Sequence, residues 1–168
     1  MVKKFTIVAI IALVGLIGLW LMFYNVWFPL QYRTEILSAT KIYQVDPVLV
    51  AAVINAESSF DNTKVSHKQA VGLMQLLPST AASLTDEEDF DLFDPATNIT
   101  LGVKYLAYLI NRFGDVDTAL FAYNAGEGNV ARWLSEQKTD KLKSCPYKAT
   151  NAYVAKIKRT MKYYRGRI

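Results

Sequence analysis

The chain has very little cysteine or histidine, with one of each among its 168 residues. The single cysteine, Cys145, excludes an internal disulfide, and one histidine with one cysteine supply too few ligands for a structural zinc site. We therefore expect the protein to need no metal and no cofactor. A net charge of +4 is the only feature that would suit nucleic acid, so we expect no nucleic-acid partner.

Charged residues are absent from Phe5–Phe28, which reads FTIVAIIALVGLIGLWLMFYNVWF. This segment is long enough to cross the hydrocarbon core of a bilayer, which is about 30 Å thick. A cleaved signal peptide usually has a shorter apolar core and small residues at its cleavage site. The segment instead ends in residues typical of a membrane interface, namely Tyr24, Asn25, Trp27 and Phe28. We therefore predict an uncleaved signal anchor.

The anchor divides the sequence into three predicted parts. These are a short cytoplasmic N-terminus over 1–4, a transmembrane segment over 5–28, and a globular domain over 29–168 that ends in a basic helix. Lys3 and Lys4 favour the cytoplasmic side for the N-terminus. The globular domain is accordingly expected on the extracytoplasmic side of a single-pass membrane protein.

Acidic residues are absent from Lys141 to the end of the sequence, a stretch with nine lysines or arginines. Such a tail can bind anionic lipid headgroups or anionic polymers, and it can equally be a solvated helix face. The opposite imbalance occurs in DEEDFDLFD, Asp86–Asp94, which carries six acidic residues.

Alternating strand patterns and internal repeats are also missing, so we predict a mostly α-helical fold. Asp46-Pro47 and Asp94-Pro95 each combine an N-cap with proline at the first helical position. Gly114 is expected to end the second of these helices. Further helices are expected over 32–44, 78–84, 118–125, 129–136 and 149–164, with Gly126 and Gly128 separating the third from the fourth.

One apolar stretch, VAAVINAESSF, is typical of a buried helix but contains a carboxylate, Glu57, at its C-terminal end. Burial and the partial negative charge of a helix C-terminus both favour the protonated carboxyl, which raises its pKa above the usual value of about 4.3. A carboxyl that holds a proton near neutral pH is what a general acid needs to protonate a glycosidic oxygen. The alternative is a structural glutamate in a salt bridge, for example with Lys64, and Glu57 alone leaves both open.

Four motifs follow one another in a fixed order: ESSF, AVGLMQLLPSTA, DPATNITLGVKYLAYLINRFGDVDTALFAYNAGEGNV and PYKATNAYV. This pattern closely resembles the soluble lytic transglycosylase family, lysozyme-like enzymes that cleave the glycan strands of peptidoglycan. The resemblance covers about Tyr32 to Tyr164. It implies a lysozyme-like, goose-type-like helical domain. With the predicted anchor, this domain would lie behind one transmembrane helix at a bacterial cell membrane.

The resemblance also implies roles for individual residues. Glu57 would be the single catalytic acid and afterwards the base. The substrate-binding residues would be Ser58, Ser66, Gly72, Met74, Gln75, Tyr123, Asn124 and Tyr153. Several have a structural alternative: Ser58 as a hydroxyl that satisfies the helix end, Ser66 and Gly72 as turn residues, Met74 as core, and Asn124 as support for a helix end.

A single acid is sufficient if the substrate supplies its own nucleophile. In the family that this chain resembles, the C6 hydroxyl of the N-acetylmuramyl residue attacks its own anomeric carbon and leaves a 1,6-anhydromuramyl end. We expect no second carboxylate within the matched motifs, and we expect the chain to leave the helix before Asp61. Hydrolysis would need such a second group.

Three residues depart from the family pattern: Gln69, Leu77 and Ala149 stand where glycine, methionine and glutamate are usual. The last departure removes a charge partner that would help to position Tyr153. Two other functions stay open, a hydrolytic muramidase and a non-catalytic glycan-binding or scaffolding subunit of a wall-spanning assembly. The sequence indicates no particular protein partner.

Overall fold

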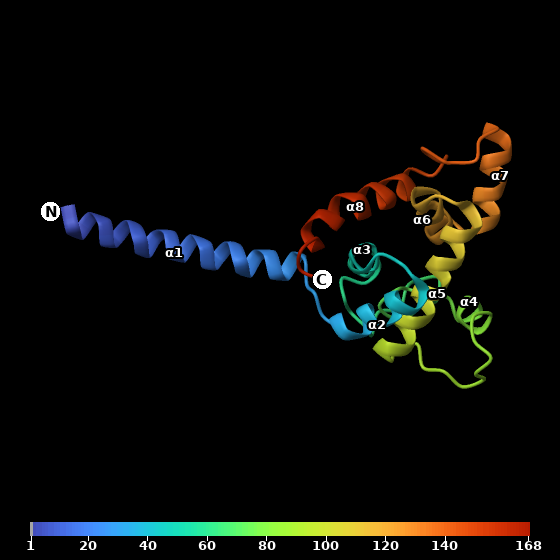
Figure 1. Ribbon diagram of the computed structural model, residues 1–168, viewed down its shortest axis with the longest axis horizontal. Helices are drawn as coiled ribbons and strands as arrows, with labels where there is room; N and C mark the ends of the chain where they lie inside the picture. The colour runs from blue at the N-terminus through green and yellow to red at the C-terminus, as the bar shows by residue number, and fades with distance from the viewer. Residues whose placement is uncertain (1) are drawn as a thin grey trace.

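The computed structural model describes residues 2–168, which fold into eight α-helices (Figure 1). They are α1 (Val2–Trp27), α2 (Arg33–Tyr43), α3 (Pro47–Glu57), α4 (Pro78–Ala82), α5 (Pro95–Phe113), α6 (Val116–Ala125), α7 (Glu127–Gln137) and α8 (Lys148–Tyr164). Within the described chain the only β-pairing consists of isolated bridges among Val65, Val71 and Leu76. The predicted mostly α-helical fold is confirmed.

Helix α1 extends away from the other seven helices as a single rod (Figure 1). Its window Ile10–Trp27 is long and apolar enough to cross a membrane, judged by length and composition. The hydrophobic core begins with Ile36, and Phe28 and Leu30 pack against it; none of the described side chains of α1 belongs to it. The core of the globular part is therefore built from residues that follow α1. The side chains of Lys3, Lys4 and Tyr24, which entered the anchor prediction, lie outside the described set.

Helix α3 lies at the centre of the globular part, where it packs against α8 and α2. Its residues Leu49–Asn55 are all buried, as the continuous apolar sequence predicts. Asp46 caps the helix because its carboxylate accepts a hydrogen bond from the amide of Val48 at 2.8 Å. Burial on all sides fixes α3 firmly, and its last residue, Glu57, inherits that fixed position.

The other predicted helix ends are mostly confirmed. Asp94 caps α5, and Gly114 ends it with a φ of 63°. Asp115, for which no prediction was made above, caps α6. The expected break at Gly128 is wrong, because that residue lies inside α7. Gly126 alone makes the turn between α6 and α7, with a φ of 88° that favours glycine.

The segment between α3 and α4 is irregular and is held in place by Asn98 of α5. The side-chain oxygen of Asn98 accepts a hydrogen bond from the Met74 amide at 2.8 Å. Its amide nitrogen donates to the carbonyls of Val71 at 3.0 Å and Leu92 at 2.8 Å. A Cβ atom on Gly72 would overlap the Asn98 side chain, so a glycine is needed where this loop crosses α5. The loop that carries several predicted site residues is therefore tied to the core.

The end of α8 returns to the point where the chain leaves α1 (Figure 1). The Tyr164 hydroxyl donates to the carbonyl of Pro29 at 3.0 Å, and the Arg167 guanidinium donates to the carbonyl of Phe28 at 2.8 Å. The rings of Phe28 and Tyr163 stack with their centroids 4.0 Å apart. We call these contacts the anchor clasp. They fix the C-terminal end of α8 beside the end of α1.

Candidate active site

Glu57, the last residue of α3, lines a cleft of about 600 Å³. The cleft is formed by Glu57, Ser66, Lys68, Ala70, Gln75, Leu76, Leu77, Thr80, Tyr105, Tyr123, Asn124, Ala125, Gly126, Glu127 and Gly128. Burial of the Glu57 carboxyl raises its pKa, and this effect outweighs the opposing influence of Tyr153, Lys64 and Lys156. The cleft thus contains a carboxyl that holds its proton more tightly than an exposed glutamate does.

Tyr153 of α8 hydrogen-bonds directly to this carboxyl. Its hydroxyl donates to Oε1 of Glu57 at 2.7 Å. Burial and the neighbouring Glu57 charge raise the pKa of the Tyr153 phenol well above its usual value, so the hydroxyl keeps its proton and remains a donor. The alanine at position 149 does not prevent this placement, since the packing of α8 on α3 brings the tyrosine to the acid.

Two lysines lie at the C-terminal end of α3. The Lys64 ammonium donates to the backbone carbonyl of Glu57, and that of Lys156 donates to the carbonyl of Ala56 at 3.4 Å. Both positive charges lower the pKa of Glu57 and so oppose the effect of burial. The alternative of a Glu57–Lys64 salt bridge is wrong: the ion pairs of the described residues do not include Glu57, and Lys64 binds the backbone.

Gln75 and Tyr123 form part of the cleft wall. The Gln75 amide nitrogen donates to the carbonyls of Lys64 at 3.0 Å and Gly72 at 2.9 Å, which leaves its amide oxygen as the group for a ligand donor. The Tyr123 hydroxyl donates to the carbonyl of Met74 at 2.8 Å. Backbone groups of one loop therefore orient both side chains.

Four of the predicted substrate-binding residues do not line the cleft: Ser58, Gly72, Met74 and Tyr153. The side chain of Met74 is 0% exposed and packs against Gly102 of α5, so the structure places it in the core. Ser58 is 4% exposed, and its hydroxyl donates to the Ile54 carbonyl at 3.2 Å, as the helix-end alternative describes. Gly72 packs against Asn98 and lies outside the cleft lining.

Ser66 and Asn124 do line the cleft. The Ser66 hydroxyl accepts a hydrogen bond from the Ala70 amide at 3.0 Å, so it also stabilises its own turn. Asn124 is exposed, and no hydrogen bond of its side chain to the end of α6 is found among the described residues. Asn129 makes such a bond, because its amide donates to the Ala125 carbonyl at 2.8 Å.

Glu127 is a cleft residue that the sequence analysis missed. Its Oε2 accepts a hydrogen bond from the Tyr108 hydroxyl at 3.0 Å and pairs with Arg112 at 3.3 Å. The expectation that the matched motifs contain no second carboxylate is therefore wrong for the cleft, and the residue was visible in AYNAGEGNV. Asp61 does lie beyond the end of α3, as expected, and accepts a hydrogen bond from the Thr63 amide at 2.9 Å.

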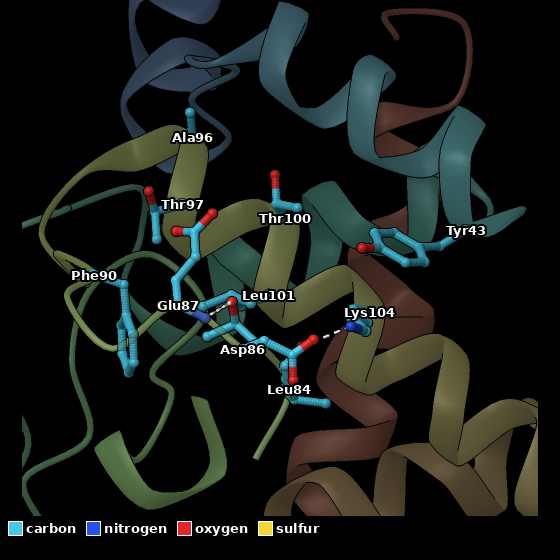
Figure 2. A pocket seen from close by; sticks show the side chains of 11 residues that line it. Tyr43, Leu84, Asp86, Glu87, Phe90, Ala96, Thr97, Thr100, Leu101 and Lys104 are labelled. Atoms are coloured by element: carbon cyan, nitrogen blue, oxygen red, sulfur yellow. Dashed lines mark hydrogen bonds between the residues drawn. The ribbon is translucent and has the colours of Figure 1, made fainter. Parts of the chain in front are cut away.

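A second cavity of about 610 Å³ lies between α5 and the acidic segment that precedes it (Figure 2). Asp86, Glu87 and Phe90 approach it from that segment, and Lys104 of α5 donates to the Leu84 carbonyl at 2.6 Å. Its lining shares no residue with the cleft of Glu57. Within residues 2–168, no group of three His, Cys, Asp or Glu side chains is placed to hold a metal ion.

Comparison with known proteins identifies the family to which the chain belongs. The family model of the transglycosylase SLT domain matches residues 35–146, and the chain belongs to this family. A transglycosylase of Enterobacteria phage PRD1 is 42% identical over 110 residues, which make up 66% of this chain and 40% of that protein.

Two solved structures show the same fold. The lytic transglycosylase Slt of Pseudomonas aeruginosa has a TM-score of 0.74 and 26% identity, and the match covers 84% of this chain and 25% of that one. The 70-kDa soluble lytic transglycosylase of Escherichia coli has a TM-score of 0.75 and 30% identity, with 82% and 24% covered, and it has also been solved in complex with bulgecin A. The predicted lysozyme-like helical domain is confirmed. The chain spans less than half the length of these relatives.

Proposed function

We propose that the protein is a peptidoglycan lytic transglycosylase that cleaves the bond between N-acetylmuramyl and N-acetylglucosamine residues. The observation that supports this most directly is Glu57 itself, a carboxyl of raised pKa that faces a cleft and is hydrogen-bonded by Tyr153. Membership of the SLT family agrees with this reaction. The substrate is the glycan strand.

In the proposed mechanism, protonated Glu57 first donates its proton to the glycosidic oxygen. The bond between this oxygen and the muramyl anomeric carbon breaks as the C6 hydroxyl of the same residue attacks that carbon. Glu57, now a carboxylate, accepts the proton that the C6 hydroxyl loses. The products are a free hydroxyl on one strand end and a 1,6-anhydromuramyl ring on the other, without addition of water.

Tyr153 has a distinct part in this cycle. Its hydroxyl donates to Glu57, which stabilises the carboxylate form that exists between the two proton transfers. Lys64 and Lys156 act in the same direction through their charge. Burial therefore favours the protonated acid before the reaction, and these three groups limit the energy of the charged state.

The remaining predicted site residues divide into two groups. Ser66, Gln75, Tyr123 and Asn124 line the cleft, and we propose that they contact the sugar and acetamido groups. Ser58, Gly72 and Met74 support the substrate site from behind: they hold the end of α3 and the loop that presents Gln75.

We also propose that α1 is a signal anchor in a bacterial cell membrane, with residues 1–4 in the cytoplasm and 29–168 outside. Its length supports this, because 26 residues at about 1.5 Å each give about 39 Å, enough for a bilayer core of about 30 Å. Exposed apolar side chains along α1 agree with a lipid environment.

A digest tests the reaction. The full chain in detergent is incubated with bacterial peptidoglycan, and the released muropeptides are weighed by mass spectrometry beside a Glu57→Gln control. We expect anhydromuropeptides, and we expect the control to be at least about 100-fold slower because it cannot donate the proton. Absence of any release from several wall types would contradict the proposal.

A muramidase is the second candidate, and the presence of Glu127 in the same cleft favours it. In that reaction a second carboxylate would activate water, and each product with a muramyl end would be one water heavier than its anhydro counterpart. The pairing of Glu127 with Arg112 and Tyr108 indicates instead that Glu127 is a structural residue of the cleft. Glu127→Gln separates the two: the transglycosylase keeps its anhydro products, whereas the muramidase loses activity as severely as it does with Glu57→Gln.

A further inference from the structure

The anchor clasp determines where the basic tail lies. The second guanidinium nitrogen of Arg167 is 3.3 Å from the side-chain oxygen of Asn25, inside the last turn of α1. Its partner nitrogen binds the Phe28 carbonyl. If α1 spans a membrane, this arginine lies at the level where the apolar segment ends, which is the headgroup region.

The neighbouring part of α8 presents a row of positive charge. Arg159, Lys162 and Arg165 are exposed and spaced by three residues, so they follow one another along one side of the helix and into its C-cap. Among the described residues none of the three belongs to an ion pair, in contrast to Lys158, which pairs with Asp117. Three cations thus remain available for an external anion.

The basic and acidic segments lie on different parts of the domain. The acidic segment Asp86–Asp94 runs along one edge of the domain from α4 to the start of α5, whereas the end of α8 touches α1 (Figure 1). An anionic surface around the end of α1 would therefore attract the basic end of α8. The stacked rings of Phe28 and Tyr163 also agree with a position in the headgroup region, because aromatic residues favour the membrane interface.

We propose that Arg159, Lys162 and Arg165 bind the headgroups of anionic phospholipids around the anchor. The clasp favours lipid over a wall polymer as the partner, because it fixes these residues beside the end of the membrane-spanning helix. We call these three residues the lipid-binding surface. Its position depends on the proposed anchor, but it is independent of the proposed catalytic reaction. It would hold the domain in one orientation on the membrane.

Vesicle binding tests the surface separately from the anchor. Residues 27–168 retain the whole core, so this fragment is used with neutral vesicles and with vesicles that contain about 30% phosphatidylglycerol. The test variant is Arg159→Gln/Lys162→Gln/Arg165→Gln. The matched control, Lys138→Gln/Lys141→Gln/Lys143→Gln, removes the same charge from exposed positions elsewhere.

We expect binding to the anionic vesicles only. At about 1 kcal/mol for each basic residue, the test variant should bind about 100-fold more weakly, whereas the control should lose much less. Salt at about 1 M should abolish the binding, because it shortens the Debye length to about 3 Å. In nanodiscs, amide exchange of 159–165 in the full chain should be slower with anionic lipid than with neutral lipid.

Three results would overturn the proposal. One is equal binding to neutral and anionic vesicles, and another is an equal loss for the test and control variants. The third is binding of the three residues to soluble polyglycerol phosphate without binding to vesicles, which would identify a wall polymer as the partner. Since none of these assays measures cleavage, failure of the surface and failure of the proposed enzyme activity remain distinguishable.

Discussion

Tyr153 and Glu57 are 96 positions apart in the sequence, yet the tyrosine hydroxyl lies 2.7 Å from the glutamate Oε1. This contact joins α8 to the end of α3, whose last residue, Glu57, lines the cleft. It lowers the pKa of Glu57, while burial raises it. The balance between these opposing effects determines when the acid is protonated.

Replacement of Tyr153 by phenylalanine removes the hydrogen bond and keeps the ring. The pKa of Glu57 should then rise further, because the carboxylate loses a donor while burial remains. Since the first step needs protonated Glu57, the alkaline limb of the pH–rate profile should move to higher pH. Tyr147→Phe, which alters an exposed ring, is the control. An unchanged alkaline limb would contradict this role of Tyr153.

Glu57→Gln should stabilise the fold at pH values above the pKa that Glu57 has in the native protein. A carboxyl whose pKa is raised by folding stabilises the native state fully below its unfolded pKa, and that contribution is lost as the pH rises through the folded pKa. The neutral amide does not titrate, so the variant should gain on the order of 1 kcal/mol above the folded pKa and little at acid pH. Urea unfolding of both chains across the pH range measures this. The same difference in the free energy of unfolding between the two chains at all pH values would argue against a pKa of Glu57 that folding raises.

Loss of the two lysines at the end of α3 should also shift the acid. Lys64→Gln/Lys156→Gln removes positive charges that lower the pKa of Glu57, so the alkaline limb should again move upward. Added salt should produce a smaller shift in the same direction in the unmodified protein. Lys148→Gln, at the other end of α8, serves as the control, and a shift of equal size there would show that net charge alone is responsible.

Gly72→Ala should be strongly destabilising. The new methyl group would overlap Asn98 and the Leu92 carbonyl oxygen, and the φ of 77° already disfavours any residue but glycine. We expect a loss of about 3 kcal/mol or more in the free energy of unfolding. Gly114→Ala is matched in φ, at 63°, but has open space around it, so it should cost only about 1 kcal/mol. Similar midpoints for the two variants in chemical unfolding would refute the packing argument.

Helix boundaries were predictable where the signal is local. Asp46 and Asp94 precede prolines, and each side chain binds a backbone amide within the next few residues. The continuous apolar run of α3 likewise indicates burial on all sides. By contrast, the helix break predicted at Gly128 was wrong. This glycine lies in the first turn of α7, where the backbone amides have no partner within the helix, so glycine disrupts the helix less there.

The site was only partly predictable. Glu57 is conspicuous because a carboxylate ends an apolar run, but the motif could not show that Met74 faces the core. That orientation depends on Gly102 and Asn98, both supplied by a helix more than 20 residues away. Glu127 lay within the matched letters and was overlooked, since only the cleft shows that it shares the wall with Tyr123.

The hydrogen bond from Tyr164 to Pro29 spans 135 positions and closes nearly the entire globular part into one loop. The chain therefore enters and leaves the globular part at the same place, next to the end of α1. A fluorescent reporter fused after Ile168 would begin beside α1 and compete with the clasp for that space. The exposed turn around Thr139 and Asp140 is the better insertion site, because it leaves both ends of the loop joined.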